Sequence, residues 1–267
     1  MKKNNILTVL RVFTALAVWF IIYKCYGTFI DPMLEGRLPE VIRMIFSAMV
    51  VPYTLGIGAA YLIVRGMKKP DRGYIASGSV EVTPGFILKS FLIQMGMAMP
   101  VMMILNIIMR IMGFPAQGMT FEQVWGEHKI FYLVLLLIFA PIVEELFFRK
   151  LFLDRLLVLG EKKAILMSAI LFGLPHLFSQ GFPQLFSTFL VGLVWADVRV
   201  KTGKLWPGIL LHMLFNLYGC YFTIFMAQNN SRAMIVVLLN LIILPVSAII
   251  IRLSGRSKKP ATAQVNL

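Results

Sequence analysis

The sequence IFYLVLLLIFAPIVEELFFRK, residues 130–150, joins a long apolar run to two adjacent glutamates and an arginine. Its length is close to the ~20 residues that a helix needs to cross a bilayer. Glu144, Glu145 and Arg149 stand near its end, although charges in hydrocarbon are costly unless they are neutralised or paired. The stretch therefore predicts a transmembrane helix whose charged residues need an explanation.

The whole chain has the composition of a membrane protein. Of its 267 residues, 59% are hydrophobic and 14% are charged, whereas a soluble domain carries about 25% charged residues. The apolar runs are continuous rather than alternating, which disfavours a β-barrel. We therefore expect an all-α, polytopic transmembrane helical bundle of about eight spans, at residues 7–27, 42–64, 86–113, 130–150, 164–178, 183–199, 205–227 and 233–251.

The basic residues orient these spans. Lysine and arginine concentrate in alternate connections, namely 65–73, 149–163, 199–204 and the C-terminal tail. Under the positive-inside rule this pattern predicts that both termini are cytoplasmic in a multi-pass protein of the cell membrane. It also accounts for the net charge of +14 without a nucleic-acid partner, since no basic stripe interleaved with aromatics occurs. We expect one transmembrane domain, 1–253, in contact with the lipid bilayer, and a polar, disordered tail, 254–267.

Helical spacing separates the roles of the two glutamates. Glu145 and Arg149 are four residues apart and can pair on one face, whereas Glu144 is rotated by about 100° and lacks such a cation. One interpretation is a solvated charge cluster at the membrane edge. If the edge instead lies near Asp154 and Arg155, Glu144 is ~15 Å deep. The second placement predicts a buried Glu145–Arg149 pair, which is costly unless function requires it.

Two of the three histidines also fall inside predicted spans. His176 lies in LFGLPHLF, with Phe172 one turn earlier, and His212 and Asn216 share one face in LHMLFNLYG. Taken separately, these residues are typical of packing contacts and of hydrogen bonds between membrane helices. Together with the glutamates they form a set of polar groups on three spans, which favours a functional site.

The three segments, in this order, resemble the CPBP family, which comprises CaaX prenyl endopeptidases and bacteriocin-processing or immunity-type membrane proteins and is also called Abi. The family signature is E-E-x-x-x-R, then F-x-x-x-H, then H-x-x-x-N. Here the motifs read EELFFR (144–149), FGLPH (172–176) and HMLFN (212–216), so every signature position is matched. The resemblance covers roughly residues 130–220.

The resemblance implies an intramembrane glutamic endopeptidase acting on a membrane-associated peptide or protein. It implies that Glu144 activates a water that His176 helps to position, and that His212 and Asn216 donate hydrogen bonds to the oxyanion. It also implies that Glu145 and Arg149 orient and hold the site. Phe172, one turn before His176, is expected from its position to be a core aromatic that walls the same face. Peptide hydrolysis needs a base beside a water and donors aimed at the oxyanion. No metal or other cofactor is expected.

Other functions use the same groups. A zinc-dependent membrane protease could employ Glu and two His, although no H-E-x-x-H pair occurs. A proton-coupled transporter could use them as a relay, although no internal repeat is evident. A non-proteolytic immunity or regulatory protein could retain the motifs without turnover. The sequence leaves the substrate, its prenylation and the oligomeric state open.

Overall fold

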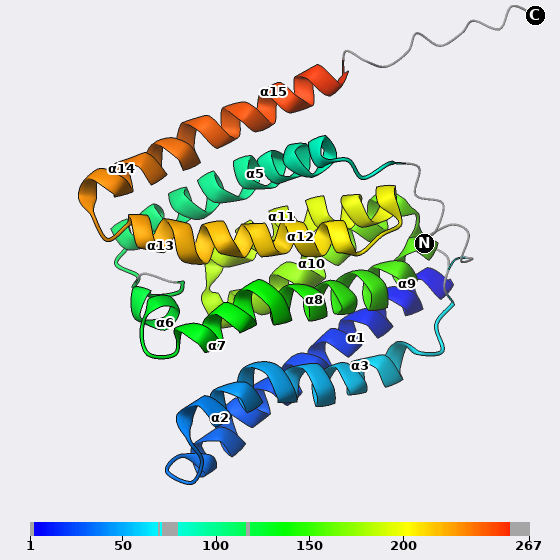
Figure 1. The fold of residues 1–267 in the computed structure, drawn as a ribbon. Coiled ribbons are helices and arrows are strands. Elements are labelled where there is room, and N and C mark those ends of the chain that lie inside the picture. The colour runs from blue at the N-terminus through cyan, green and yellow to red at the C-terminus, as the bar shows by residue number, and fades with distance from the viewer. Residues whose placement is uncertain (1–2, 69, 71–79, 116–117, 257–267) are drawn as a thin grey trace, which may run out of the picture.

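The fold is helical throughout the part of the chain that is described. The computed structural model describes residues 3–68, 70, 80–115 and 118–256, and no strand occurs among them. The α-helices, shown in Figure 1, are α1 (Lys3–Cys25), α2 (Glu40–Ile45), α3 (Ile57–Val64), α5 (Pro84–Ile111), α6 (Phe121–Trp125), α7 (Lys129–Val134), α8 (Ala140–Glu145), α9 (Asp154–Leu156), α10 (Glu161–Gln180), α11 (Phe182–Thr202), α12 (Trp206–Asn216), α13 (Thr223–Met226), α14 (Asn230–Leu238) and α15 (Leu244–Arg256).

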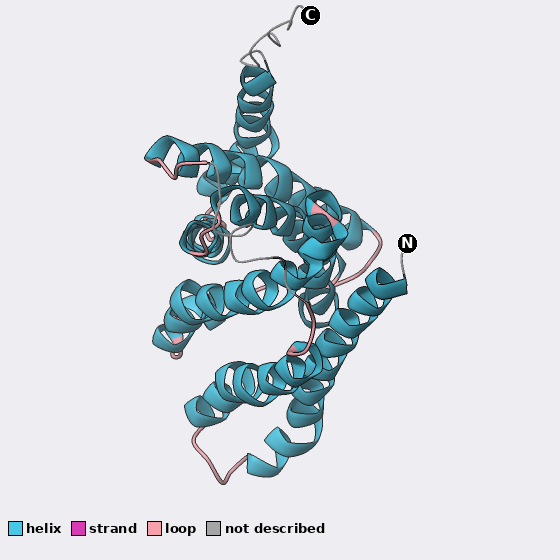
Figure 2. Cartoon of the chain, turned by 90° about the vertical axis from the view of Figure 1, so that its right-hand side faces the viewer, coloured by secondary structure: helices cyan, strands magenta, loops and turns pink. Residues whose placement is uncertain are grey.

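Short segments of different helical pitch join several α-helices into longer continuous rods, as Figure 2 shows. The π-helical segments are η1 (Tyr26–Ile30), η3 (Phe46–Gly56), η4 (Leu135–Phe139), η5 (Leu146–Leu153), η7 (Leu217–Phe222) and η8 (Leu239–Ile243). The 3₁₀ segments are η2 (Asp31–Leu34) and η6 (Leu157–Leu159). Two of these segments, η4 and η5, flank α8, so both glutamates lie within one uninterrupted rod.

Six helical runs are long and apolar enough to cross a membrane, by length and composition: Asn4–Leu34, Glu40–Val64, Pro84–Ile111, Lys129–Leu159, Trp206–Met226 and Asn230–Ser254. They support a multi-pass membrane protein. The predicted spans 164–178 and 183–199 are also helical, as α10 and α11, but are not among the six. Both helices have many buried residues, and a helix surrounded by protein needs less apolar surface than one facing lipid. The eight-span count therefore stays a prediction.

Small residues bring α10 and α11 together. Gly181, with φ +88°, provides the left-handed backbone for the sharp turn between them. A Cβ added at Gly192 would lie 3.2 Å from the Ala169 Cα, so the glycine lets the two backbones approach closely. This packing sets the Phe172 ring 5.3 Å from that of Trp195. The pair thereby forms one wall of the candidate site.

The N-terminal helix supports the second span. The Trp19 indole donates to the Pro52 carbonyl at 2.8 Å. A Cβ added at Gly56 would lie 2.7 Å from the same indole, so a larger residue there would collide with it. These contacts fix the position of Pro52 and Gly56 in η3. Tyr53 follows Pro52 directly, so its position depends on the same contacts.

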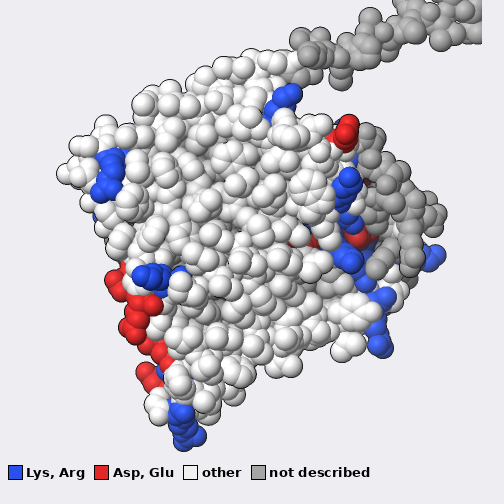
Figure 3. Space-filling model, in the orientation of Figure 1, with Lys and Arg blue, Asp and Glu red and all other residues white. Residues whose placement is uncertain are grey.

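Connections that are predicted to lie on the same side of the membrane contact one another. At one end, Arg199 pairs with Asp154 at 3.2 Å, and the Arg155 guanidinium donates to the Val64 carbonyl at 2.8 Å. At the other end, His128 lies 3.5 Å from Glu40. Figure 1 shows that α1 begins and α15 ends at the same end of the bundle. In Figure 3 the charged side chains gather toward the two ends, with an uncharged band between them. The cytoplasmic orientation remains a prediction.

Candidate active site

Glu144 faces a residue from the second predicted span. The Tyr53 hydroxyl donates to Glu144 Oε1 at 3.0 Å, and the Tyr53 ring packs edge-on against Phe139 at 5.2 Å. The Glu144 side chain is 17% exposed, whereas that of the adjacent Glu145 is 1% exposed. Of the two carboxylates, Glu144 is therefore the more exposed.

Glu145 and Arg149 form the pair that their spacing predicts. The Arg149 Nε lies 3.3 Å from Glu145 Oε2, and both side chains are buried. The guanidinium also donates from Nη1 to Ser168 Oγ at 2.8 Å and lies 5.0 Å from the centre of the Phe172 ring. The arginine is therefore held by an ion pair, a hydroxyl and an aromatic face, as a buried cation requires. The run Lys129–Leu159 continues well past Arg149, which agrees with an arginine inside the span.

α12 packs closely against the Glu145–Arg149 pair. Gly208 lies in the first turn of α12, and a Cβ added there would come within 2.9 Å of Glu145 Oε2. Any side chain at this position would therefore displace the carboxylate. The missing side chain lets the helix that carries His212 pack directly against α8.

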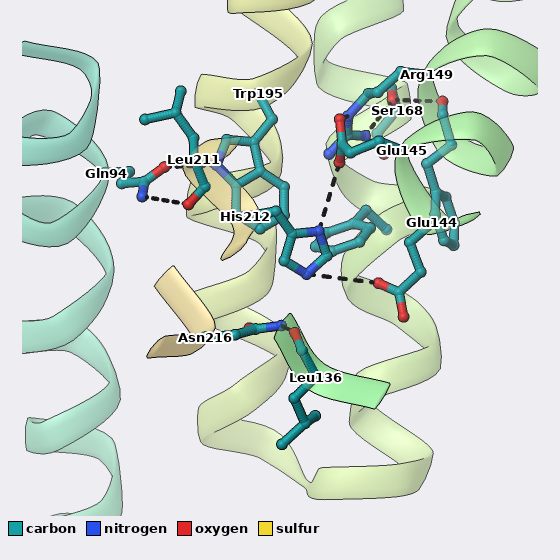
Figure 4. Close-up of polar contacts among 12 residues, drawn as sticks. Gln94, Leu136, Glu144, Glu145, Arg149, Ser168, Trp195, Leu211, His212 and Asn216 are labelled. Atoms are coloured by element: carbon teal, nitrogen blue, oxygen red, sulfur yellow. Dashed lines mark hydrogen bonds and ion pairs between the residues drawn. The ribbon is translucent and has the colours of Figure 1, made fainter. Parts of the chain in front are cut away.

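His212 lies between the two carboxylates (Figure 4). Its Nε2 is 3.9 Å from Glu144 Oε2, and its Nδ1 is 3.9 Å from Glu145 Oε1. Both distances exceed hydrogen-bond length, so each is a contact that a small movement or a bridging molecule could close. The imidazole stacks on Trp195, with centroids 4.2 Å apart at 24°. One imidazole thus faces both motif glutamates with opposite ring nitrogens.

Phe172 connects the two histidines. Its ring centre is 5.2 Å from that of His176 and 5.9 Å from that of His212. The His176 Nδ1 lies 2.9 Å from the Phe172 carbonyl. A carbonyl only accepts, so Nδ1 carries the hydrogen and Nε2 of the neutral ring is an acceptor. The predicted wall residue therefore also sets the orientation and tautomer of His176.

Asn216 is anchored to the rod that carries the glutamates. It lies one turn beyond His212, and its Nδ2 donates to the Leu136 carbonyl at 2.8 Å. Pro141 has no N–H, and in the π-helical register of η4 the carbonyl five residues earlier, that of Leu136, loses its donor. The Asn216 amide supplies that missing hydrogen bond. Its second amide hydrogen remains for another acceptor.

Residues 126–218 match the family model described as type II CAAX prenyl endopeptidase Rce1-like. This segment resembles an Rce1-like domain. The match confirms the family resemblance drawn from the three motifs, and it spans about a third of the chain. No curated protein and no solved structure matches the chain.

The segment 126–218 contains every site residue that the motifs predicted, but not every residue that contacts them or their neighbours. Tyr53 and Gln94 lie outside it and were missed. Gln94 is fully buried in α5; its Nε2 donates to the Leu211 carbonyl at 3.0 Å, and its Oε1 accepts from the Trp195 indole at 2.6 Å (Figure 4). A buried glutamine within an apolar span was a signal that could have found it.

Inside the Rce1-like domain, sequence reasoning also missed Trp195 and Ser168. Trp195 forms the stacking face for His212, and Ser168 accepts from Arg149 and donates to the Phe148 carbonyl at 3.3 Å. Ser168 lies in the predicted span 164–178 and Trp195 in the predicted span 183–199. Each is surrounded in the sequence by residues with the spacing of a packed helix, so neither differed from an ordinary packing residue. Among the described residues, no group of three or more His, Cys, Asp and Glu is arranged to hold a metal ion.

Proposed function

We propose that this protein is an intramembrane endopeptidase in which Glu144 activates water to hydrolyse a peptide bond. The Rce1-like match supports a CAAX-type endopeptidase. The observation that carries the mechanism is the placement of Glu144 Oε2 opposite His212 Nε2, with Glu144 more exposed than Glu145. A base that can reach water, beside a ring that can donate or accept, is the minimum that hydrolysis requires.

In the proposed reaction a water binds beside Glu144 and gives up a proton to its carboxylate. The water oxygen attacks the carbonyl carbon of the scissile peptide bond, and the C=O electron pair moves onto oxygen. When this tetrahedral intermediate collapses, the C–N bond breaks and protonated Glu144 returns the proton to the leaving nitrogen. The products are a carboxylic acid and an amine, and Glu144 is regenerated.

The neighbouring residues supply the remaining contacts. Neutral His176 presents Nε2 as an acceptor, because its Nδ1 is bound to the Phe172 carbonyl, and it can therefore orient a hydrogen of the water. His212, when protonated at Nε2, and the second amide hydrogen of Asn216 donate to the oxyanion. Such donors are most effective where water is excluded and their positions are fixed beforehand. Arg149 holds Glu145, so the Glu145 carboxylate has a fixed position opposite Nδ1 of His212.

A cleft of about 550 Å³ offers a path for the substrate. It runs between η3–α3 and α8–η5, and its lining includes Tyr53, Val143, Leu146 and Phe147. Tyr53, which donates a hydrogen bond to Glu144, lines the cleft, so the cleft lies next to a direct neighbour of the proposed base. Its apolar walls suit a chain presented from the bilayer of the cell membrane. We therefore propose a membrane-associated peptide or protein as substrate, with a prenylated C-terminal segment as the class to test first.

The test compares peptides released by membranes containing wild type or Glu144→Ala, identified by mass spectrometry. Peptides present only with wild type would support the mechanism and locate the cleavage site, whereas an unchanged peptide set would overturn it. Metal analysis of the purified protein separates this function from zinc-dependent proteolysis. Stoichiometric zinc, with activity lost on chelation and restored by zinc, would replace the glutamate-only mechanism.

A further inference from the structure

A second cavity lies apart from the candidate active site. It has a volume of about 840 Å³, is formed by residues of α5, α10, α11 and α15, and contains none of the site residues described above. Pockets of roughly 300–1,000 Å³ are the size that binds small-molecule ligands. α5 and α15 belong to candidate membrane spans, so molecules of the bilayer have access to this part of the bundle.

The cavity is cationic at one end and apolar along its length. Lys89, Lys201 and Arg252 line it close to the start of α5, the end of α11 and the end of α15, respectively. Met97 lies eight residues beyond Lys89, which is about 12 Å deeper along the helix at 1.5 Å per residue. Deeper lining residues are apolar and include Ile93 and Leu193.

Two of the three cations have no ion-pair partner in the part of the chain that the structure describes. Lys201 pairs with Asp197 at 2.6 Å. Among the described residues, no carboxylate lies within ion-pair distance of Lys89 or Arg252. The Arg252 guanidinium turns toward the cavity, with its Nη2 3.5 Å from the Met97 sulfur. A thioether is only a weak acceptor, so both cations remain available for an anionic group.

We propose that this cavity binds an anionic phospholipid. Its phosphate lies between Lys89 and Arg252, and one acyl chain follows the apolar wall past Ile93, Met97 and Leu193. A lone cation at the end of a span is explained by snorkelling. Here, cations from different helices line one largely apolar cavity, which offers partners for the phosphate and for an acyl chain of a phospholipid. Basic pockets between transmembrane helices recognise anionic headgroups in this way. Such lipid binding does not depend on peptidase activity.

The experiment measures lipid retention by native mass spectrometry and thermal stability in detergent. Purified full-length protein is titrated with phosphatidylglycerol, phosphatidylcholine or inorganic phosphate. We expect wild type to retain phosphatidylglycerol and to gain thermal stability from it, with neither effect from the other two. Lys89→Ala/Arg252→Ala should bind phosphatidylglycerol about 30-fold more weakly, since each cation contributes about fivefold.

A matched control removes two cations elsewhere. Arg110 and Lys129 are exposed, and neither lines the cavity, so Arg110→Ala/Lys129→Ala should bind like wild type. Leu193→Trp, which fills the apolar part and keeps every cation, should also lose lipid while keeping its melting temperature in lipid-free detergent. Unchanged binding by the Lys89/Arg252 variant would overturn the proposal. Equal loss in both charge variants, or equal retention of phosphatidylcholine by wild type, would also overturn it.

Discussion

The Tyr53 hydroxyl donates a 3.0 Å hydrogen bond to Glu144 Oε1, joining two residues that are 91 positions apart in the chain. Tyr53 lies outside the Rce1-like domain, whereas Glu144 begins that domain's first motif. The proposed base is therefore oriented by a residue from the N-terminal part of the protein. The first spans thus contribute directly to the candidate site.

Removal of this hydroxyl tests that contribution. We expect Tyr53→Phe to lower kcat by about tenfold to a hundredfold, because a hydrogen bond to a charged group is worth about 1.5–3 kcal/mol. Steady-state cleavage of a membrane substrate measures the effect. Tyr61 lines the same cleft and makes no hydrogen bond to Glu144, so Tyr61→Phe is the control. An unchanged kcat in Tyr53→Phe would remove Tyr53 from the site.

The two glutamates should respond differently to substitution. Glu144→Gln should abolish cleavage with little change in melting temperature, because Glu144 is partly exposed and has no cation partner on its helix. Glu145→Ala should destabilise the fold by about 3–5 kcal/mol, because it leaves Arg149 buried without its counter-charge. Thermal unfolding in detergent and a cleavage assay separate the two effects. Similar melting temperatures for the two variants would contradict this division.

The contact between Gly208 and Glu145 can be tested with a single methyl group. A Cβ at Gly208 would lie 2.9 Å from Glu145 Oε2, so Gly208→Ala should lower both the melting temperature and kcat. A Cβ at Gly219, in the same helical run, would meet Met99 at an ordinary 3.8 Å. Gly219→Ala should therefore behave like wild type. Equal behaviour of the two alanine variants would show that α12 does not depend on this close approach.

Gln94 should influence catalysis through Trp195. Gln94→Leu removes the acceptor for the Trp195 indole and the donor to Leu211, so the ring that stacks on His212 loses its anchor. We expect kcat to fall by about tenfold with little change in KM, since an unsatisfied buried group costs about 1–3 kcal/mol. Asn106→Leu is the control, because Asn106 bonds only to the Met102 carbonyl within α5. An equal loss of kcat in both variants would indicate a general effect on α5.

Asn216 combines a structural bond with a proposed catalytic one, and a double variant separates them. Asn216→Ala leaves the Leu136 carbonyl without its donor, so both stability and kcat should fall. Adding Pro141→Ala restores a backbone N–H in the same rod and should recover the melting temperature. The rate should stay low if the amide also binds the oxyanion. Recovery of both quantities would assign Asn216 a purely structural role.

Some features were predictable because they depend on spacing along one helix. Glu145 and Arg149 pair because residues four apart share a face, and His212 and Asn216 follow one another for the same reason. The helical class follows from the length of the apolar runs, and the placement of Arg149 inside its span agrees with the depth estimate. The eight-span count could not be tested equally well, because α10 and α11 are buried and less apolar.

The sequence by itself determined the helical class, the motif residues and the pairs within each helix, since these depend on local composition and a repeat of 3.6 residues per turn. Only the tertiary structure decided that His212 lies between Glu144 and Glu145, that Tyr53 reaches Glu144 and that Gln94 supports Trp195. These contacts join different helices. Their geometry depends on how closely backbones pack at positions such as Gly192 and Gly208, which periodicity along one helix does not encode.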